Sequence, residues 1–323
     1  MKRVFISALF LFLVLGCSGQ GDGTCPDERP EPVVLYSGLE APQHVAARGG
    51  TVYWTEGSRV MAGSACGGAP VLLAEGQNNP SRIVSDEEFV YFANDNTSGE
   101  VKRVPRGGGA IETLASGQFL VRDLATDNDR VYFTTNNQIM AVRKDGGSPS
   151  ALATGELDPT GIAVDEENIF WINAGTETTG GTIRKMAKSG GRPTTIEELG
   201  PSTSGTSDHL VLDETRGYWG RFDSHQLRWF SKRGGEAGVL FGDGESDLVP
   251  VDLVLRDGEL FFTAYPNMGD GVVMRIGTRG EKQAKLAMLP GRRPQGLAVS
   301  EAHVFWVVVD PGDRSGAIMR LMR

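Results

Sequence analysis

The 323-residue sequence has few of the features that a helical or membrane-spanning protein needs. Its longest apolar run, residues 4–15, has about 12 residues, whereas a transmembrane helix needs about 20. No segment of useful length repeats its apolar residues with the period of a helix. We therefore expect an all-β protein without a membrane-spanning segment.

Basic residues are also scarce. Lys and Arg number 32 against 41 Asp and Glu, which gives a formal net charge of −9. Loss of the leader with Lys2 and Arg3 would take the chain to about −11. A general nucleic-acid binder needs clustered Lys and Arg to displace counterions, so this class of function is excluded.

Cysteine and histidine are rare, with three and four residues respectively. Neither Cys25 nor Cys66 has a nearby His, and two thiols are too few for a zinc site. In an exported protein they predict one disulfide, with two independent thiols as the alternative. The sequence also lacks a phosphate-binding loop and a Ser-His-Asp set with a recognisable nucleophile motif.

The N-terminus predicts export. Lys2 and Arg3 precede the apolar run, which has the length of a signal-peptide core. The stretch 14–17, Val-Leu-Gly-Cys, resembles a bacterial lipobox, which would make Cys17 the acylated first residue of the mature chain. The alternative is an ordinary signal peptide that is cut near Gly16 or Ser18, with Cys17 discarded. Ser18 after the cysteine is similar to lipoproteins sent to the outer membrane, on either its periplasmic or its outer side.

Three regions follow from this pattern: a signal peptide (1–16), the lipidated Cys17 with a Gly- and Pro-rich tether (17–32), and one folded domain (33–323). In the folded region an aromatic motif such as "TVYWTEGSRV" recurs seven times. The gaps between the motifs are 38 to 48 residues. The central aromatics are Tyr53, Tyr91, Tyr132, Phe170, Tyr218, Phe261 and Phe305.

Periods of about 40–50 residues with several short strands are typical of propeller blades. Each unit holds four strand-like runs, with a glycine turn such as "KDGG" before the fourth. In four units an aspartate ends the first run, where it can accept hydrogen bonds from turn amides. These are Asp86, Asp127, Asp165 and Asp213.

The last unit stops after its third strand, whereas one spare strand, at about residues 33–36, precedes the first unit. We therefore predict a seven-bladed β-propeller of four-stranded antiparallel blades, closed by pairing of this N-terminal strand near Val34 with the C-terminal segment around Met319. Closure removes unpaired sheet edges. A Cys25–Cys66 bridge would hold the segment before the spare strand next to the point of closure.

The motifs "YWTE", "GIAVD" and "PQGLAVS" resemble the YWTD and NHL classes of β-propeller repeat, over essentially the whole mature chain. YWTD rings usually have six blades, whereas this sequence has seven motifs. The resemblance implies the propeller fold. It selects no function, because the class includes receptors, scaffolds, sensors and a few enzymes.

Polar residues should converge at one mouth of the central channel, where the residues one and two positions after the proline, or its equivalent, that begins each blade would meet. The expected binding residues are His44, Arg82, Arg122, Asp123, Asp208, His209 and Asp252. Two interpretations stay open: a site for a polar ligand, or arginines that neutralise the aspartates in a wet channel. Phe222, Trp229 and Tyr265 are the aromatics expected near the surface.

An enzymatic alternative resembles the seven-bladed propeller lyases of the virginiamycin B lyase type, with His44 and His209 as the catalytic pair. Two imidazoles more than about 10 Å apart, without a shared carboxylate, would rule out a two-His metal site there. No metal or other cofactor is expected. Calcium at the acidic turns 94–99, 242–247 and 310–316 is the alternative to plain loops.

The combined prediction is a lipid-anchored, monomeric, non-catalytic binding or scaffold module of the bacterial cell envelope. Its partner would be a protein or a small polar ligand at the channel mouth. The membrane would be contacted through the lipid anchor alone, and nucleic acid is not a partner.

Overall fold

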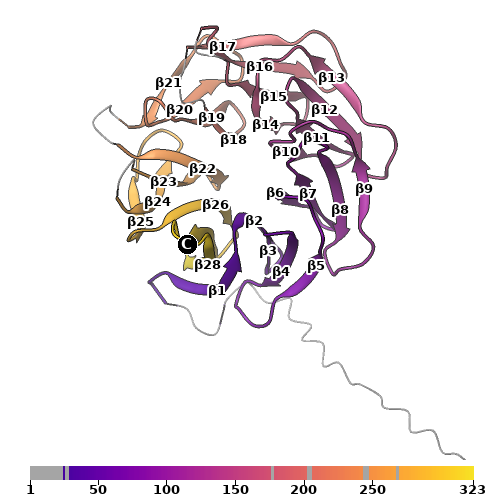
Figure 1. Ribbon diagram of the computed structural model, residues 1–323. Coiled ribbons are helices and arrows are strands. Elements are labelled where there is room, and N and C mark those ends of the chain that lie inside the picture. The colour runs from indigo at the N-terminus through magenta and orange to yellow at the C-terminus, as the bar shows by residue number, and fades with distance from the viewer. Residues whose placement is uncertain (1–24, 26–28, 176–177, 202–205, 243–246, 267–268) are drawn as a thin grey trace, which may run out of the picture.

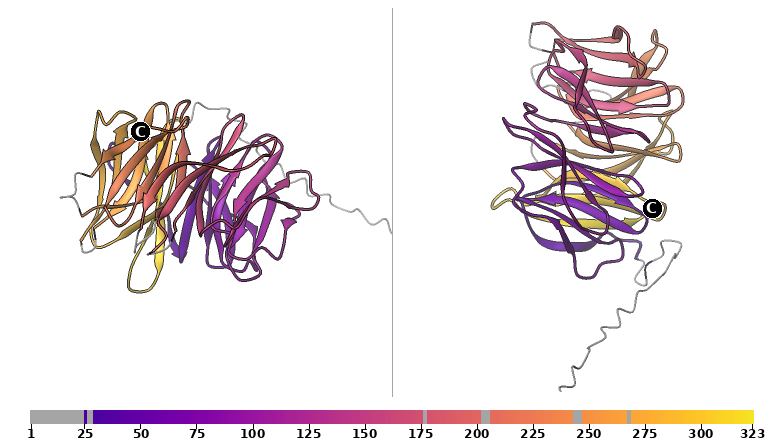
Figure 2. Two further views of the ribbon diagram at one scale, coloured as in Figure 1. Left: turned by 90° about the horizontal axis from the view of Figure 1, so that it is seen from above. Right: turned by 90° about the vertical axis from the view of Figure 1, so that its right-hand side faces the viewer.

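Seven four-stranded antiparallel sheets stand in a ring around a central channel (Figures 1 and 2). The computed structural model describes residues 25, 29–175, 178–201, 206–242, 247–266 and 269–323. This part of the chain contains no helix, and therefore none long and apolar enough to span a membrane. The predicted all-β, seven-bladed propeller is confirmed.

Each blade has its first strand innermost. Blade 1 contains β2 (Pro42–Arg48), β3 (Thr51–Glu56), β4 (Arg59–Ser64) and β5 (Val71–Ala74). Blade 2 contains β6 (Pro80–Ser85), β7 (Phe89–Asn94), β8 (Glu100–Pro105) and β9 (Glu112–Ala115). Blade 3 contains β10 (Leu124–Thr126), β11 (Arg130–Thr134), β12 (Gln138–Arg143) and β13 (Ser150–Thr154).

The next three blades repeat this order. Blade 4 contains β14 (Pro159–Val164), β15 (Asn168–Asn173), β16 (Gly181–Ala187) and β17 (Thr194–Gly200). Blade 5 contains β18 (Thr206–Leu212), β19 (Arg216–Arg221), β20 (Gln226–Ser231) and β21 (Ala237–Phe241). Blade 6 contains β22 (Val249–Arg256), β23 (Glu259–Tyr265), β24 (Gly271–Gly277) and β25 (Ala284–Leu289).

Blade 7 closes the ring with strands from both ends of the chain. It contains β26 (Arg293–Val299), β27 (His303–Val309), β28 (Ser315–Met322) and, outermost, β1 (Val33–Glu40). β1 pairs antiparallel with β28, and Val34 lies opposite Met319. The predicted closure is confirmed, and Figure 1 shows the indigo β1 beside the yellow C-terminal strands.

The recurring aromatic pairs hold neighbouring blades together. Two successive residues of a strand point to opposite faces, so each pair contacts both adjacent blades. Tyr53 packs forward against Phe92 of blade 2, and Trp54 packs back against Phe305 of blade 7. All seven blade interfaces repeat this arrangement in seven buried clusters. The motif therefore supplies the core of the ring.

A second set of contacts, between aspartates and lysines, joins blades on the face opposite the expected channel mouth. Asp86 accepts the amides of Glu88 and Phe89 and the hydroxyl of Tyr91, as predicted for the turn aspartates. It also binds the ammonium of Lys144 from blade 3 at 2.6 Å. Burial alone would raise the pKa of Asp86, but Lys144 and the amides lower it to about 2.

This aspartate–lysine pair recurs around the ring. Lys188 binds Asp127 at 2.7 Å, and Lys232 binds Asp165 at 2.6 Å. Each lysine stands just before the glycine turn of the following blade. The sequence motif K-x-G-G in these turns therefore indicates a contact between blades. This contact was not predicted from the repeat pattern.

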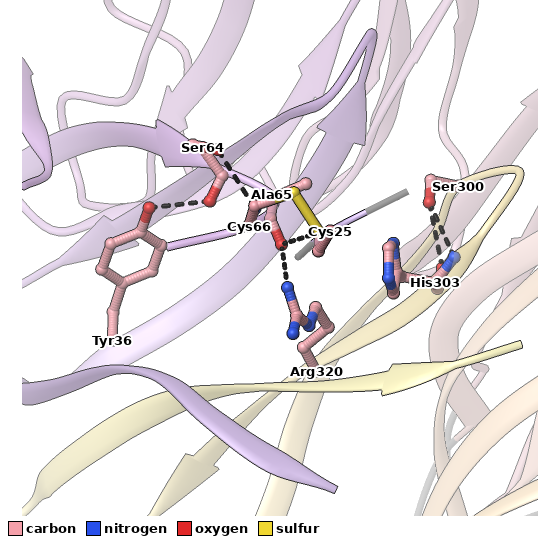
Figure 3. The surroundings of a disulfide bond; sticks show 8 residues. All are labelled: Cys25, Tyr36, Ser64, Ala65, Cys66, Ser300, His303 and Arg320. Carbon is pink, nitrogen blue, oxygen red and sulfur yellow. Dashed lines mark hydrogen bonds between the residues drawn. A yellow bond between two sulfur atoms is a disulfide. The ribbon is translucent and has the colours of Figure 1, made fainter. Parts of the chain in front are cut away.

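The predicted disulfide joins Cys25 to Cys66, with their Cα atoms 5.2 Å apart (Figure 3). Cys66 lies in the hairpin between β4 and β5, on the face opposite the mouth. Next to it, the guanidinium of Arg320 from β28 donates to the carbonyl of Ala65 at 3.0 Å, and Tyr36 from β1 donates to the carbonyl of Ser64 at 2.8 Å. The bridge thus ties the N-terminal segment to blade 1 where blades 1 and 7 meet.

We predict that replacing both bridged cysteines, Cys25→Ser with Cys66→Ser, lowers the free energy of unfolding by about 4 kcal/mol, because the bridge closes a loop with a sequence separation of 41 residues. Urea unfolding followed by tryptophan fluorescence would measure this. Reductant should lower the stability of the wild-type protein by the same amount and leave the variant unchanged. Equal stability of the variant and the oxidised wild type would contradict the prediction.

Candidate functional site

A break in the innermost strands creates the channel mouth. In β2, β6, β14 and β26 the pairing with the second strand is interrupted after the proline and resumes three residues later. The two residues in between leave the ladder, as in a β-bulge. Gln43 and His44 of β2, and Ser81 and Arg82 of β6, therefore line the channel. This is the position at which the sequence predicted the site.

The threonine of the aromatic motif fixes these breaks. Thr55 accepts the amide of His44 at 3.2 Å and donates to the carbonyl of Ser81 in blade 2 at 3.2 Å. Thr263 likewise joins the amide of Asp252 to the carbonyl of Gln295, at 3.1 and 3.0 Å. Each of these threonines holds the mouth residues of two successive blades in register.

Asp252 is the centre of the site. Its carboxylate lies 2.7 Å from Nδ1 of His209 in blade 5 and 3.4 Å from Nε2 of His44 in blade 1. The two imidazole rings are stacked, with centroids 5.3 Å apart. The carboxylate also accepts the amides of Leu253 at 2.7 Å and Leu297 at 2.5 Å. Asp252 thus joins blades 5, 6, 7 and 1.

The guanidinium of Arg82 completes this network. It contacts Nε2 of His209 and donates through Nε to the carbonyl of Arg122 at 2.9 Å. Because Arg82 can only donate, Nε2 of His209 accepts, and Nδ1 carries the proton that His209 donates to Asp252. Arg82, neutral His209 and ionised Asp252 therefore form a chain of charge-assisted hydrogen bonds.

The environment keeps His209 neutral. Burial, followed by the positive charge of Arg82, lowers the pKa of His209 to about 4, although Asp252 acts in the opposite direction. Burial by itself would raise the pKa of Asp252, but His209 and His44 hold it well below its usual range. Near neutral pH the pair is an ionised carboxylate and a neutral imidazole.

The other predicted mouth residues have different positions. Asp123 turns away from the channel and accepts the amides of Leu124 and Ile162, both at 2.9 Å, so that it joins blades 3 and 4. Its carboxylate also lies 3.7 Å from Nε of Arg82. Arg122 pairs with Asp158 at 2.8 Å, a partner that was not anticipated. The side chain of Asp208 lies outside the described part of the structure.

The mouth encloses a cavity of about 350 Å³. Its described lining consists of Gln43, His44, Ser81, Arg82, Asp95, Arg122, His209, Phe222, Val251, Asp252, Tyr265, Arg293, Gln295 and Gly296. Phe222 and Tyr265 therefore reach the site, whereas Trp229 lies under the guanidinium of Arg216 at 3.8 Å.

Arg293 and Asp95 were missed as cavity residues, and Asp158 was missed as the partner of Arg122. Arg293 and Asp158 stand directly before the proline of their blades. Extending the repeat alignment by one residue would have found both. Asp95 follows the second strand of blade 2, which the alignment from the proline did not reach.

His44, His209 and Asp252 could between them offer three metal-ligand atoms that lie within 4.8 Å of one another. The imidazoles are close and share a carboxylate, so a two-His metal site is not ruled out on distance. However, Nδ1 of His209 donates its proton to Asp252, and Nε2 accepts from Arg82. A cation at Nδ1 would require a proton on Nε2, facing the guanidinium. The donor set therefore fits a hydrogen-bonded network better than a metal.

The acidic turns considered for calcium have local partners where they are described. Asn96 accepts the amide of Ser98 at 2.9 Å, and Asp310 pairs with Arg292 at 2.7 Å. Asp313 accepts the amide of Ser315 at 2.9 Å. Of the turn at 242–247, residues 243–246 lie outside the described residues.

We predict that acid destabilises the protein through His209. Its pKa is 6.5 in an unfolded chain and about 4 in the folded protein, so between these values the unfolded chain binds more protons. The stabilisation is complete above pH 6.5 and is lost as the pH falls toward 4. His209→Gln, which cannot titrate, should lose about 2 kcal/mol less stability than the wild type between about pH 7.5 and 5.0 in urea unfolding. Identical losses in the two proteins would contradict this.

Comparison with known proteins finds the fold but no family. No family model matches the chain, and no curated protein matches it. In contrast, 1136 chains of solved structures match, so the architecture is too widespread to select a function by itself.

Three structural neighbours illustrate how widespread the fold is. A crystal structure of a nidogen/laminin complex contains a chain with a TM-score of 0.57 and 14% identity, covering 83% of this chain and 97% of that one. The designed protein Ika8 has a TM-score of 0.61 and 12% identity, with 90% and 99% coverage. The AfRom2 CNH domain has a TM-score of 0.61 and 9% identity, with the same coverage. At these identities the likeness supports the β-propeller fold alone.

Proposed function

We propose that the protein is a lipid-anchored, non-catalytic binding module of the bacterial cell envelope. Its channel mouth would bind a polar ligand, either free or displayed on a partner protein. The observation that carries this proposal is the cavity of about 350 Å³, whose lining is drawn from several blades. A volume of this size is within the range of small-molecule sites, which is roughly 300–1,000 Å³.

The polar residues of the mouth are held in fixed positions, which favours a binding function. These residues are fixed by hydrogen bonds between blades, so the site is preformed and its side chains would lose little entropy when a ligand binds. Asp252, for example, is held by two backbone amides and by His209. Such a site fits recognition of one defined polar group.

The alternative, a lyase or hydrolase that uses His44 and His209, has one favourable observation, the carboxylate shared by the two imidazoles. A general base needs a free lone pair within reach of the substrate proton. In His209, Nδ1 carries a proton and Nε2 accepts from Arg82. His209 would thus serve as a positioning residue, and catalysis would depend on His44 alone. We therefore favour binding.

We predict that blocking the cavity abolishes binding. Gln295, which lines the cavity, would be replaced by Trp in the chain from Gly23 onward, which contains the whole closed ring. The larger indole would reduce the space for a ligand. Small molecules retained from an extract of bacterial envelopes, measured by mass spectrometry, should be lost. Gln283→Trp, on the exposed outer edge of blade 6, is the matched control and should retain them. Equal retention by both variants would argue against a binding site at the mouth.

For the anchor, we predict that Cys17→Ser releases the protein from the membrane fraction, because the acyl chains are attached at this residue and each buried CH₂ contributes about 0.8 kcal/mol. Fractionation of cells that express the full chain, followed by immunoblotting, would show the distribution. Ser18→Ala leaves the cysteine in place and is the control. An unchanged membrane fraction for Cys17→Ser would count against acylation.

A further inference from the structure

Arginines gather at the cavity of an otherwise acidic chain. The protein carries a net charge of −9, yet three arginines and only two aspartates line the cavity. One of these aspartates, Asp252, is already engaged by His209, His44 and two amides. Two of the arginines have carboxylates beside them, Asp158 at 2.8 Å from Arg122 and Asp123 at 3.7 Å from Arg82, whereas Arg293 has no carboxylate partner among the described residues. A positive charge of this kind at the rim of a cleft attracts ligands of the opposite sign.

Two of the arginines retain donors for a ligand. Arg122 uses its Nη2 to bind Asp158 at 2.8 Å, whereas its Nε is buried without a hydrogen-bond partner. Arg293 is exposed at the rim, with its guanidinium 5.1 Å from the ring centre of Tyr265. Among the described residues no carboxylate forms an ion pair with Arg293. Its neighbour Arg292 instead binds Asp310 at 2.7 Å.

Further unsatisfied polar atoms lie on the same wall as Arg122. Oγ of Ser81 and Nδ1 of His44 are buried and have no hydrogen-bond partner. These residues belong to blades 1 and 2, next to Arg122 of blade 3. A buried polar group without a partner costs about 1–3 kcal/mol, so three of them around one cavity indicate a ligand that can satisfy them.

The other side of the cavity differs in character. Phe222 and Tyr265, from blades 5 and 6, contribute aromatic surface there, and the guanidinium of Arg293 lies 5.1 Å from the ring centre of Tyr265. Aromatic faces contact flat or ring-shaped ligand bodies. The cavity thus offers polar hydrogen-bonding groups on one wall and aromatic surface on the other.

From this arrangement we infer that the ligand is a small monocarboxylate with a ring-sized body, an inference that rests on the proposed binding function. The carboxylate would accept from Arg122 and Ser81, and the ring would lie against Phe222 and Tyr265. A single negative charge is the most that this wall accommodates, because Asp158 already faces Arg122. A dianion such as phosphate would bring a second negative charge near Asp95 and Asp252.

The test uses matched acid and neutral compounds on the chain from Gly23 onward. Glucuronate is compared with glucose, and benzoate with benzyl alcohol, by isothermal titration calorimetry; inorganic phosphate is a fifth probe. The two acids differ in their ring, so the comparison distinguishes a sugar body from an aromatic one. At least one acid should bind roughly tenfold or more tightly than its neutral partner, because charge-assisted hydrogen bonds are worth about 1.5–3 kcal/mol.

Point variants of three arginines would show where the carboxylate of the acid binds. Arg122→Gln should weaken binding of that acid by roughly tenfold or more, because the buried Nε and the charge are both lost. Arg293→Gln breaks no ion pair among the described residues and should weaken binding of the acid by a smaller factor. This second variant keeps the inference testable if Arg122→Gln does not fold. Arg192→Gln is the control, because Arg192 is exposed in the β16–β17 hairpin on the opposite face. Binding of the acid should there be unchanged.

Three outcomes would overturn the inference. Neutral compounds that bind as tightly as the acids would exclude an anion while leaving the binding function intact. Phosphate that binds more tightly than either acid would exclude a monocarboxylate. If none of the five probes binds, this ligand class is wrong, whereas the proposed function is tested separately by the Gln295→Trp experiment. Equal effects of Arg122→Gln and Arg192→Gln would place the acid elsewhere.

Discussion

Closure of the ring is the constraint on which every other contact depends. Each blade interface is filled by aromatics from two neighbouring blades, so an open chain would leave two of these surfaces exposed. The seventh interface, in which Phe305 meets Trp54, exists because blade 7 is completed by β1 on β28. The hydrophobic effect thus drives both ends of the chain toward one blade. The Cys25–Cys66 bridge and the Arg320 contact lie beside this closure.

The candidate site is a product of the same closure. Asp252 of blade 6 contacts His209 of blade 5, Leu297 of blade 7 and His44 of blade 1. Blade 1 meets β26 of blade 7 only in a closed ring, because β26 to β28 come from the C-terminal end of the chain and blade 1 from the N-terminal end. Gly296 makes the approach of blades 7 and 1 possible, since a Cβ there would lie 2.7 Å from the Cα of His44. Stability and site formation are therefore linked.

Much of the fold could be predicted from the sequence, because repetition carries the information. Seven aromatic motifs, the turn aspartates and the spare strand near Val34 each indicate a local structure, and only one architecture satisfies all of them. The site was predicted less completely. The proline alignment located His44 and Arg82 at the mouth, and one more aligned position would have added Asp158 and Arg293. Which side chains pair, such as Asp252 with His209 and His44, is set by distances between blades, which no periodicity encodes.

The aspartates of the mouth explain how an acidic protein presents arginines to its cavity. At the mouth, Asp123 and Asp252 accept backbone amides from their own blade and from the next one. Their negative charge is used to join blades and is partly compensated by these N–H groups. Arg122 pairs with Asp158 but retains a buried donor, and Arg293 forms no ion pair among the described residues. Because the same carboxylates that stabilise the ring are turned toward its backbone, the positive groups are left to face a ligand.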